Sequence, residues 1–359
     1  MKSDTKKRKI FVGVSGGVDS SVSLYLLKKA GHDVTGVFIR TWSPDFVDCT
    51  WKDERRDAMR VCAELDVPYM ECDAEDAYKK GVADYMIEEY KKGRTPNPDV
   101  MCNREVKFGV FWQFAKSHGA DAIATGHYAR ISPNYEFLKG TDESKDQAYF
   151  LWTLKQEELD HILFPVGDMQ KEEVRKIAKK IGLSNAKKKD SQGVCFLGPI
   201  NMREFLKHYI EETPGNVINT EGKVIGHHDG SVFFTIGERH GFVITEKSDN
   251  ESPYYVVEKD VNKNTITVSN RTKESFENKI EVKEILLSSP VLRTKIDDNK
   301  VYDVQFRYHG EYFPCKVKHG EGEKRMTLAP VKTFPNVALG QSSVIYDGEI
   351  CIGGGIVDA

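Results

Sequence analysis

The chain has 359 residues, of which 39% are hydrophobic and 30% charged, and its formal net charge is −3. These values argue against a disordered or membrane protein. The chain is longer than one hydrophobic core usually supports, since single cores stop growing near about 250–300 residues. The seven cysteines contain no C-x-x-C pair, so neither a disulfide framework nor a zinc ribbon is expected. The first apolar run, Ile10 to Val14, is too short for a signal sequence or a membrane span. We expect a cytoplasmic protein of two or three domains with reduced thiols.

The first half of the chain alternates short β-branched runs with helical patterns. This alternation predicts a Rossmann-like α/β domain, in which crossover helices cover a parallel sheet. The predicted strands are 9–14, 33–40, 68–72 and 122–125, and the predicted helices are 20–29, 52–65, 75–92, 104–118, 171–181 and 201–210.

From about Pro214 the pattern changes to short alternating runs separated by turn residues. Such runs are typical of antiparallel sheets and predict an all-β second half. The predicted strands are 216–219, 231–236, 254–258, 265–269, 301–308 and 342–346.

A segment of glycine and serine, Ser15-Gly16-Gly17-Val18-Asp19-Ser20-Ser21, joins the first predicted strand to the first predicted helix. Small residues let backbone N–H groups close around an anion, and a helix N-terminus adds the positive end of its dipole. The segment is neither a Walker A loop nor a G-x-G-x-x-G loop. The alternative is a glycine-rich turn in which Asp19 or Ser20 caps the helix. The setting favours a phosphate-binding loop.

Two segments place a cysteine in a setting that favours the thiolate. Cys102 is expected to precede the helix from Arg104, and Cys195 follows the lysines 187–189. A thiol near a helix N-terminus or near lysines has a lowered pKa and can accept sulfane sulfur as a persulfide. The alternative, a buried structural cysteine, is expected for the other five. These are Cys49, Cys62, Cys72, Cys315 and Cys351.

These motifs resemble those of a known family. The segment 15–21 resembles the S-G-G-x-D-S-S loop of the PP-loop ATP pyrophosphatases, which cleave ATP between the α and β phosphates and transfer AMP to a carbonyl oxygen. The segments 96–103 and 190–198, with the spacing between Cys102 and Cys195, resemble the cysteine motifs of the bacterial and organellar tRNA-specific 2-thiouridylases. Further segments that resemble this family are 125–130, 145–151, 234–241 and 338–355.

The resemblance implies three domains. It implies a PP-loop ATP-binding catalytic domain of the adenine nucleotide α-hydrolase type over residues 1–203, a small β-rich central domain over 204–280, and a C-terminal β-barrel that contacts tRNA over 281–359. The implied activity is that of a sulfurtransferase, which adenylates the C2 oxygen of the wobble uridine and replaces it with persulfide sulfur. The implied partners are the tRNAs for Lys, Glu and Gln and a persulfide donor from a cysteine desulfurase or a sulfur-relay protein.

The resemblance also assigns roles to residues. Cys195 would carry the persulfide, Cys102 would be the nucleophile that releases the sulfur or resolves the intermediate, and a transient Cys102–Cys195 disulfide would follow. Asp99 would be the acid or base near the target base. The implied ATP-binding residues are Gly13, Val14, Ser15, Gly16, Gly17, Val18, Asp19, Ser20, Ile39 and Gly126. The implied contacts to tRNA or to the target base are Asn97, Pro98, Asp99, Lys145, Asp146, Gln147, Arg307 and Tyr308.

Three alternatives stay open at this point. Mg²⁺ is expected with ATP and no tightly bound metal is required, but Asp99, Cys102 and Cys195 could instead hold an iron–sulfur cluster. A PP-loop amidotransferase or ligase would use ammonia or an amine and would need no paired thiols. A nucleotide-sensing RNA-binding module would hold ATP without turnover, and pyrophosphate release that depends on tRNA would exclude it.

Overall fold

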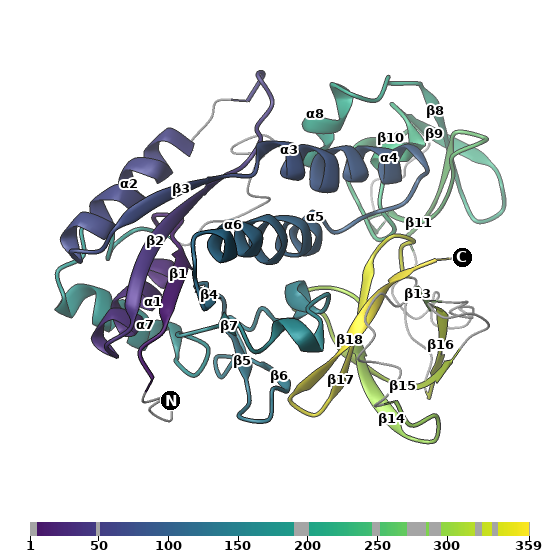
Figure 1. Cartoon of the computed structure of the whole chain (residues 1–359). Coiled ribbons are helices and arrows are strands. Elements are labelled where there is room, and N and C mark those ends of the chain that lie inside the picture. Colours follow the sequence, from purple (N-terminus) through teal and green to yellow (C-terminus); the bar gives the residue numbers. More distant parts are fainter. Residues whose placement is uncertain are drawn as a thin grey trace.

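The computed structural model describes residues 6–47, 51–189, 201–245, 252–270, 285–286, 296–319, 325–331 and 337–358. The first sheet has five parallel strands in the order β3-β2-β1-β4-β7 (Figure 1). This sheet confirms the predicted α/β fold. The strands are β1 (Lys9–Gly13), β2 (Asp33–Arg40), β3 (Tyr69–Asp73), β4 (Ala122–Ala124) and β7 (Ile162–Leu163).

Helices cover both faces of this sheet. Successive side chains of its central strand point to opposite sides, and both sets are apolar, so both faces need a covering layer. Ile10 and Val12 belong to one buried cluster and Phe11 belongs to another. The Ile10 side packs against α1 (Val18–Lys29), α2 (Trp51–Glu64) and α7 (Lys171–Lys180). The Phe11 side packs against α3 (Glu75–Tyr78), α4 (Tyr85–Lys91), α5 (Pro98–Met101) and α6 (Phe111–Ser117).

Two of these helices contain π-helical segments that the sequence did not predict. Residues Lys79–Asp84 join α3 to α4, and residues Cys102–Val110 join α5 to α6. The helix that contains residues 102–110 therefore begins at Pro98, and the predicted start at Arg104 is wrong. The Asn97 side chain caps this helix by accepting hydrogen bonds from the backbone N–H groups of Asp99 and Val100, and proline suits the first helical position. Cys102 consequently lies inside the helix and does not precede it.

The second sheet is a five-stranded unit in the order β10-β9-β8-β12-β11. Helix α8 (Met202–Lys207) precedes it. The predicted strand at 231–236 is wrong, because Ser231–Phe233 forms a 3-10 turn that follows Gly230 at φ 150°. The strands are β8 (Gly215–Ile218), β9 (Val224–His228), β10 (Phe242–Ile244), β11 (Tyr255–Asp260) and β12 (Thr265–Ser269).

The third sheet contains a closed barrel. Its strands follow the order β13-β16-β15-β14-β17-β18-β6-β5, and an additional pairing of β13 with β18 closes the ring. The hairpin of β5 (Ala129–Ile131) and β6 (Phe137–Lys139) comes from the first half of the chain and joins the outside of β18. The α/β half and the barrel therefore share one sheet. The barrel strands are β13 (Ile285–Leu286), β14 (Val301–Gln305), β15 (Tyr312–His319), β16 (Arg325–Pro330), β17 (Ser342–Asp347) and β18 (Ile350–Val357).

Tyr149 is a second connection between these halves. It lies in the 3-10 turn Ala148–Leu151, is only 1% exposed, and its hydroxyl lies 3.1 Å from the carbonyl oxygens of Phe306 and Ser342. Tyr149→Phe leaves these acceptors without that donor, so we expect the free energy of unfolding to fall by about 1–2 kcal/mol. Urea denaturation measures this change, with Tyr135→Phe at a half-exposed loop position as the control. Equal stability of the two variants would contradict this role.

Candidate ATP and thiol site

The predicted phosphate loop lies at a strand-to-helix junction, between the end of β1 at Gly13 and the start of α1 at Val18. Gly16 adopts φ 72°, a conformation that favours glycine. The carbonyl oxygen of Gly17 accepts hydrogen bonds from the hydroxyls of Ser20 at 3.2 Å and Ser21 at 2.7 Å. The loop therefore ends in a helix N-terminus, where backbone N–H groups and the helix dipole favour an anion.

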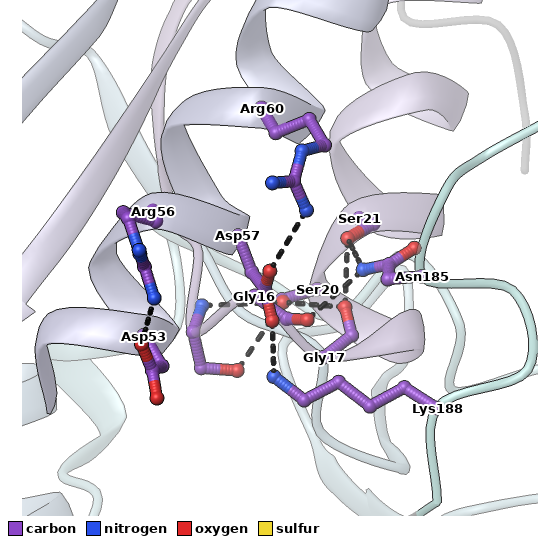
Figure 2. Close-up of polar contacts among 11 residues, drawn as sticks. Gly16, Gly17, Ser20, Ser21, Asp53, Arg56, Asp57, Arg60, Asn185 and Lys188 are labelled. Atoms are coloured by element: carbon purple, nitrogen blue, oxygen red, sulfur yellow. Dashed lines mark hydrogen bonds and ion pairs between the residues drawn. The ribbon is translucent and has the colours of Figure 1, made fainter. Parts of the chain in front are cut away.

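The loop packs against α2 and against the segment that follows α7 (Figure 2). A Cβ atom on Gly16 would lie 2.7 Å from Asp57 Cβ and 2.8 Å from the carbonyl oxygen of Glu54, so only glycine fits here. The Asn185 side-chain amide donates hydrogen bonds to the Gly16 carbonyl at 3.0 Å and to Ser21 Oγ at 2.9 Å. The sequence did not predict these supports.

Asp19 is a bridge between helices. Its carboxylate accepts hydrogen bonds from Lys171 Nζ at 2.8 and 2.7 Å and from the Tyr128 hydroxyl at 2.8 Å. Lys171 is the first residue of α7 and only 8% exposed, so its ammonium needs a nearby counter-charge. The Asp19 carboxylate therefore ties α1 to α7, so its loss should also affect the stability of the fold.

The other predicted nucleotide residues lie at the same edge of the sheet. Gly126 follows β4, and a Cβ atom on it would lie 2.6 Å from the backbone nitrogen of Ser20, inside the first turn of α1. Ile39 is half-buried near the end of β2, beside Gly13 of β1, where an added Cβ would lie 3.6 Å from Ile39 Cδ1. Open α/β sheets bind ligands beyond the carboxyl ends of their strands, and the structure brings this whole set to that edge.

The helix over residues 98–117, here called the thiol helix because it contains Cys102, reaches the segment that follows β4. Cys102 is 4% exposed, and Asp99 lies about one turn before it in the same helix. Burial raises the pKa of Asp99, and the charge of Lys107 acts against this shift. Lys107 Nζ lies 3.3 Å from Nε2 of His127, which directly follows Gly126. The sequence did not predict a role for Lys107, which lies in the π-helical segment Cys102–Val110.

His127 is neutral in this environment. Burial holds its pKa well below the usual range, and the charge of Lys107 adds to this effect. Nε2 therefore accepts a hydrogen bond from the Lys107 ammonium, and the proton on Nδ1 is donated to Thr125 Oγ1 at 2.8 Å.

The neutral state of His127 predicts a dependence of stability on acid. Below pH about 6.5 the unfolded chain gains a proton on His127 that the folded chain does not, so the free energy of unfolding falls by up to about 1.4 kcal/mol per pH unit. Urea denaturation at about pH 7.5 and about pH 5.5 measures this loss. His127→Gln removes the titrating group, and we expect a loss smaller by about 1 kcal/mol or more. An equal loss in both proteins would contradict the neutral assignment.

Cys195 and its segment 190–198 lie outside the described residues. The persulfide role of Cys195 and the transient disulfide with Cys102 therefore stay predictions. The lysines that precede the segment are described, and Lys188 Nζ lies 2.8 Å from Asp57 Oδ2 in α2.

Part of the predicted tRNA set has internal roles. The Asp146 carboxylate accepts hydrogen bonds from the backbone N–H groups of Gly140 and Ala148, and the Gln147 side chain accepts one from the backbone of Tyr128. Lys145 is half-buried. These bonds position the segment before Tyr149 whether or not it also contacts RNA.

The remaining members lie on two other elements. Asn97 and Pro98 form the cap of the thiol helix, and Pro98 is buried. Arg307 is exposed and donates a hydrogen bond to the carbonyl oxygen of Ile236 in the central domain. The Tyr308 ring lies 4.4 Å from that of Phe150, so the barrel places Tyr308 beside the segment 145–151.

Neither a metal cluster nor a membrane helix is found in the part of the chain that the structure describes. No group of three or more His, Cys, Asp or Glu side chains among these residues is placed to hold a metal ion. Within the same ranges, no helix has the length and apolar character needed to cross a membrane.

The fold and this edge of the sheet define a class: an α/β nucleotide-binding protein with a PP-loop-type anion loop, followed by two β-rich domains. Family models cover the same arrangement. Residues 8–199 match the tRNA methyl transferase HUP domain, 203–270 the tRNA methyl transferase PRC-barrel domain, and 278–357 the aminomethyltransferase beta-barrel domain.

Curated relatives agree along the whole length. The tRNA-specific 2-thiouridylase MnmA of Lysinibacillus sphaericus is 42% identical, over 99% of this chain and 95% of the relative. The enzymes of the same name from Pediococcus pentosaceus and Listeria welshimeri are 42% and 40% identical, over 99% and 100% of this chain and 96% of each relative. The chain belongs to the tRNA-specific 2-thiouridylase family, which confirms the resemblance seen in the sequence.

Proposed function

We propose that this protein is a tRNA sulfurtransferase that converts a wobble uridine to 2-thiouridine at the expense of ATP. One observation carries the proposal: the phosphate loop and the thiol helix both contact the segment that directly follows β4. Gly126 packs on the first turn of α1, and His127 beside it contacts Lys107 of the thiol helix. The reaction needs this proximity, because the carbonyl that receives AMP is the one that sulfur then attacks.

The first step activates the base. The uracil C2 oxygen forms a bond to the α-phosphorus of ATP, the bond from that phosphorus to the α,β-bridging oxygen breaks, and pyrophosphate leaves with the electron pair. The loop 15–20 and the N-terminus of α1 would hold the phosphates, with Gly126 and Ile39 beside the nucleotide. Mg²⁺ bound to the phosphates would find an oxygen ligand in the Asp19 carboxylate beside the loop.

The second step exchanges sulfur for oxygen. The outer sulfur of a persulfide on Cys195 attacks C2, the C2–O bond breaks, and AMP leaves with the oxygen. The Cys102 thiolate then attacks the inner sulfur, which releases 2-thiouridine and forms the Cys102–Cys195 disulfide; a cellular thiol reduces it afterwards. Alternatively, Cys102 attacks the persulfide first and frees hydrosulfide. Asp99, whose pKa is raised by burial, would exchange a proton with the base.

The partners in this proposal follow the family. They are the tRNAs for Lys, Glu and Gln, bound in part by the barrel and by segment 145–151, and a cytoplasmic persulfide donor from a cysteine desulfurase or relay protein. If Asp99, Cys102 and Cys195 instead hold an iron–sulfur cluster, anaerobically purified protein would contain iron and inorganic sulfide.

Pyrophosphate release tests the proposal against its alternatives. We expect release to require the cognate tRNA and to persist without a sulfur donor, because adenylation needs neither thiol. Release without tRNA, or none with it, would contradict the proposal. An amidotransferase would instead consume ammonia or an amine with the adenylate, and a methyltransferase would not cleave ATP.

A further inference from the structure

Lys188 lies beside the phosphate loop although it is far from that loop in sequence. Its ammonium lies 2.8 Å from Asp57 Oδ2. Asp57 in turn packs on the loop, because a Cβ atom added to Gly16 would lie 2.7 Å from Asp57 Cβ. Figure 2 shows the Lys188 side chain reaching toward Gly16 and Asp57. Lys188 is half-buried, so its charge is partly withdrawn from water at the edge of the loop.

Asp57 holds the Lys188 ammonium in a way that allows its release. Asp57 already has a second cation, because Arg60 Nη1 lies 3.2 Å from its Oδ1. Asp57 therefore keeps a partner if Lys188 leaves. Glu54 lies one turn earlier on the same helix, and burial raises the pKa of its carboxyl group, against the opposing charge of Lys188. A triphosphate at the N-terminus of α1 carries several negative charges and would compete strongly for this ammonium.

The backbone near Lys188 is fixed relative to the loop. Asn185, only 8% exposed, donates to both the Gly16 carbonyl and Ser21 Oγ, and Arg175 of α7 donates to the Lys188 carbonyl at 3.1 Å. The side chain of Lys188 can therefore exchange partners while its Cα stays in place. A preorganised cation of this kind costs little reorganisation when the ligand arrives.

We propose that Lys188 is a phosphate-binding residue of the ATP site, which Asp57 holds when no nucleotide is present and which transfers to the β- and γ-phosphates when ATP binds. The proposal rests on the proposed function and deepens it. It also assigns Lys188 a place in adenylation, where it would neutralise charge on the departing pyrophosphate. AMP lacks these phosphates, so Lys188 should distinguish ATP from AMP.

Calorimetric titration of the full-length protein with ATP and Mg²⁺, and separately with AMP, tests this assignment. We expect Lys188→Met to weaken ATP binding by about ten- to hundredfold and to leave AMP binding within about twofold. Lys188→Arg should restore most of the affinity for ATP because it keeps the charge. The control is Lys187→Met, which removes an exposed lysine one residue earlier and should change neither affinity.

Asp57→Asn separates phosphate binding from a merely structural ion pair. If the pair only stabilises the fold, Lys188→Met and Asp57→Asn should lower the melting temperature alike and leave the ratio of ATP to AMP affinity unchanged, which would overturn the proposal. If Lys188 transfers to phosphate, Asp57→Asn should bind ATP at least as tightly as the natural protein. Because the titration contains neither tRNA nor a sulfur donor, it tests phosphate binding by Lys188 independently of thiolation. A natural protein that binds ATP no better than AMP would overturn the assignment itself.

Discussion

Cys102→Ser is expected to abolish catalytic thiolation while a persulfide still forms on Cys195. A serine hydroxyl is a far weaker nucleophile toward sulfur at neutral pH than a thiolate, so the sulfur cannot be released or the intermediate resolved. The side chain is buried in the thiol helix, and serine is close to cysteine in size, so the fold should survive. Tandem mass spectrometry of peptides after loading with a persulfide donor, together with assays of thiolated tRNA, measures both effects.

Cys195→Ser should be inactive for a different reason. It removes the site of productive persulfide loading, while pyrophosphate release with tRNA continues because ATP chemistry needs neither thiol. Activated tRNA would then accumulate or hydrolyse without gaining sulfur. Added sulfur on Cys102 with Cys195 unmodified would reverse the two roles, and full thiolation by the Cys195→Ser protein would contradict the mechanism. The matched control is Cys315→Ser, a buried barrel cysteine for which no chemical role is proposed.

Asp19→Asn is expected to reduce tRNA-dependent pyrophosphate release by at least about a hundredfold and also to lower stability. The carboxylate neutralises the nearly buried ammonium of Lys171, and removing one member of such a pair costs about 3–5 kcal/mol when the pair is fully buried. Asp19 is partly exposed, so we expect a smaller loss of about 2–3 kcal/mol in the free energy of unfolding.

A second substitution separates these two effects. Asp19→Asn combined with Lys171→Met removes both charges, and we expect it to recover most of the stability but not the pyrophosphate release. Thermal denaturation and a coupled pyrophosphate assay on the two variants measure this. If the double variant recovers both, Asp19 acts only through the fold and its place in the ATP site is wrong.

Local signals made the phosphate loop predictable. Ser15 to Ser21 follows an apolar strand and opens a helix, and the loop lies at that junction. The start of the thiol helix could also have been predicted, because Asn97 followed by Pro98 is a strong helix-start signal. Its π-helical segment could not, since π-helices are rare and have no comparable local signal.

The sequence could not predict which distant residues pair, and the reason is physical. Asp19 and Lys171 are 152 positions apart, and Asp57 and Lys188 are 131 apart, so nothing local indicates which charges meet. The hairpin of β5 and β6 was missed for a similar reason. Its strands have three residues each, and β6 joins the barrel strand β18, more than two hundred positions away.

The most direct test of the account is mass spectrometry of tRNA nucleosides after incubation of the protein with ATP, Mg²⁺ and a persulfide donor. The account predicts 2-thiouridine at the wobble position of the tRNAs for Lys, Glu and Gln, formed in proportion to AMP and absent when ATP or the donor is omitted. Unmodified tRNA under complete conditions, or a methylated nucleoside in place of a thiolated one, would contradict it.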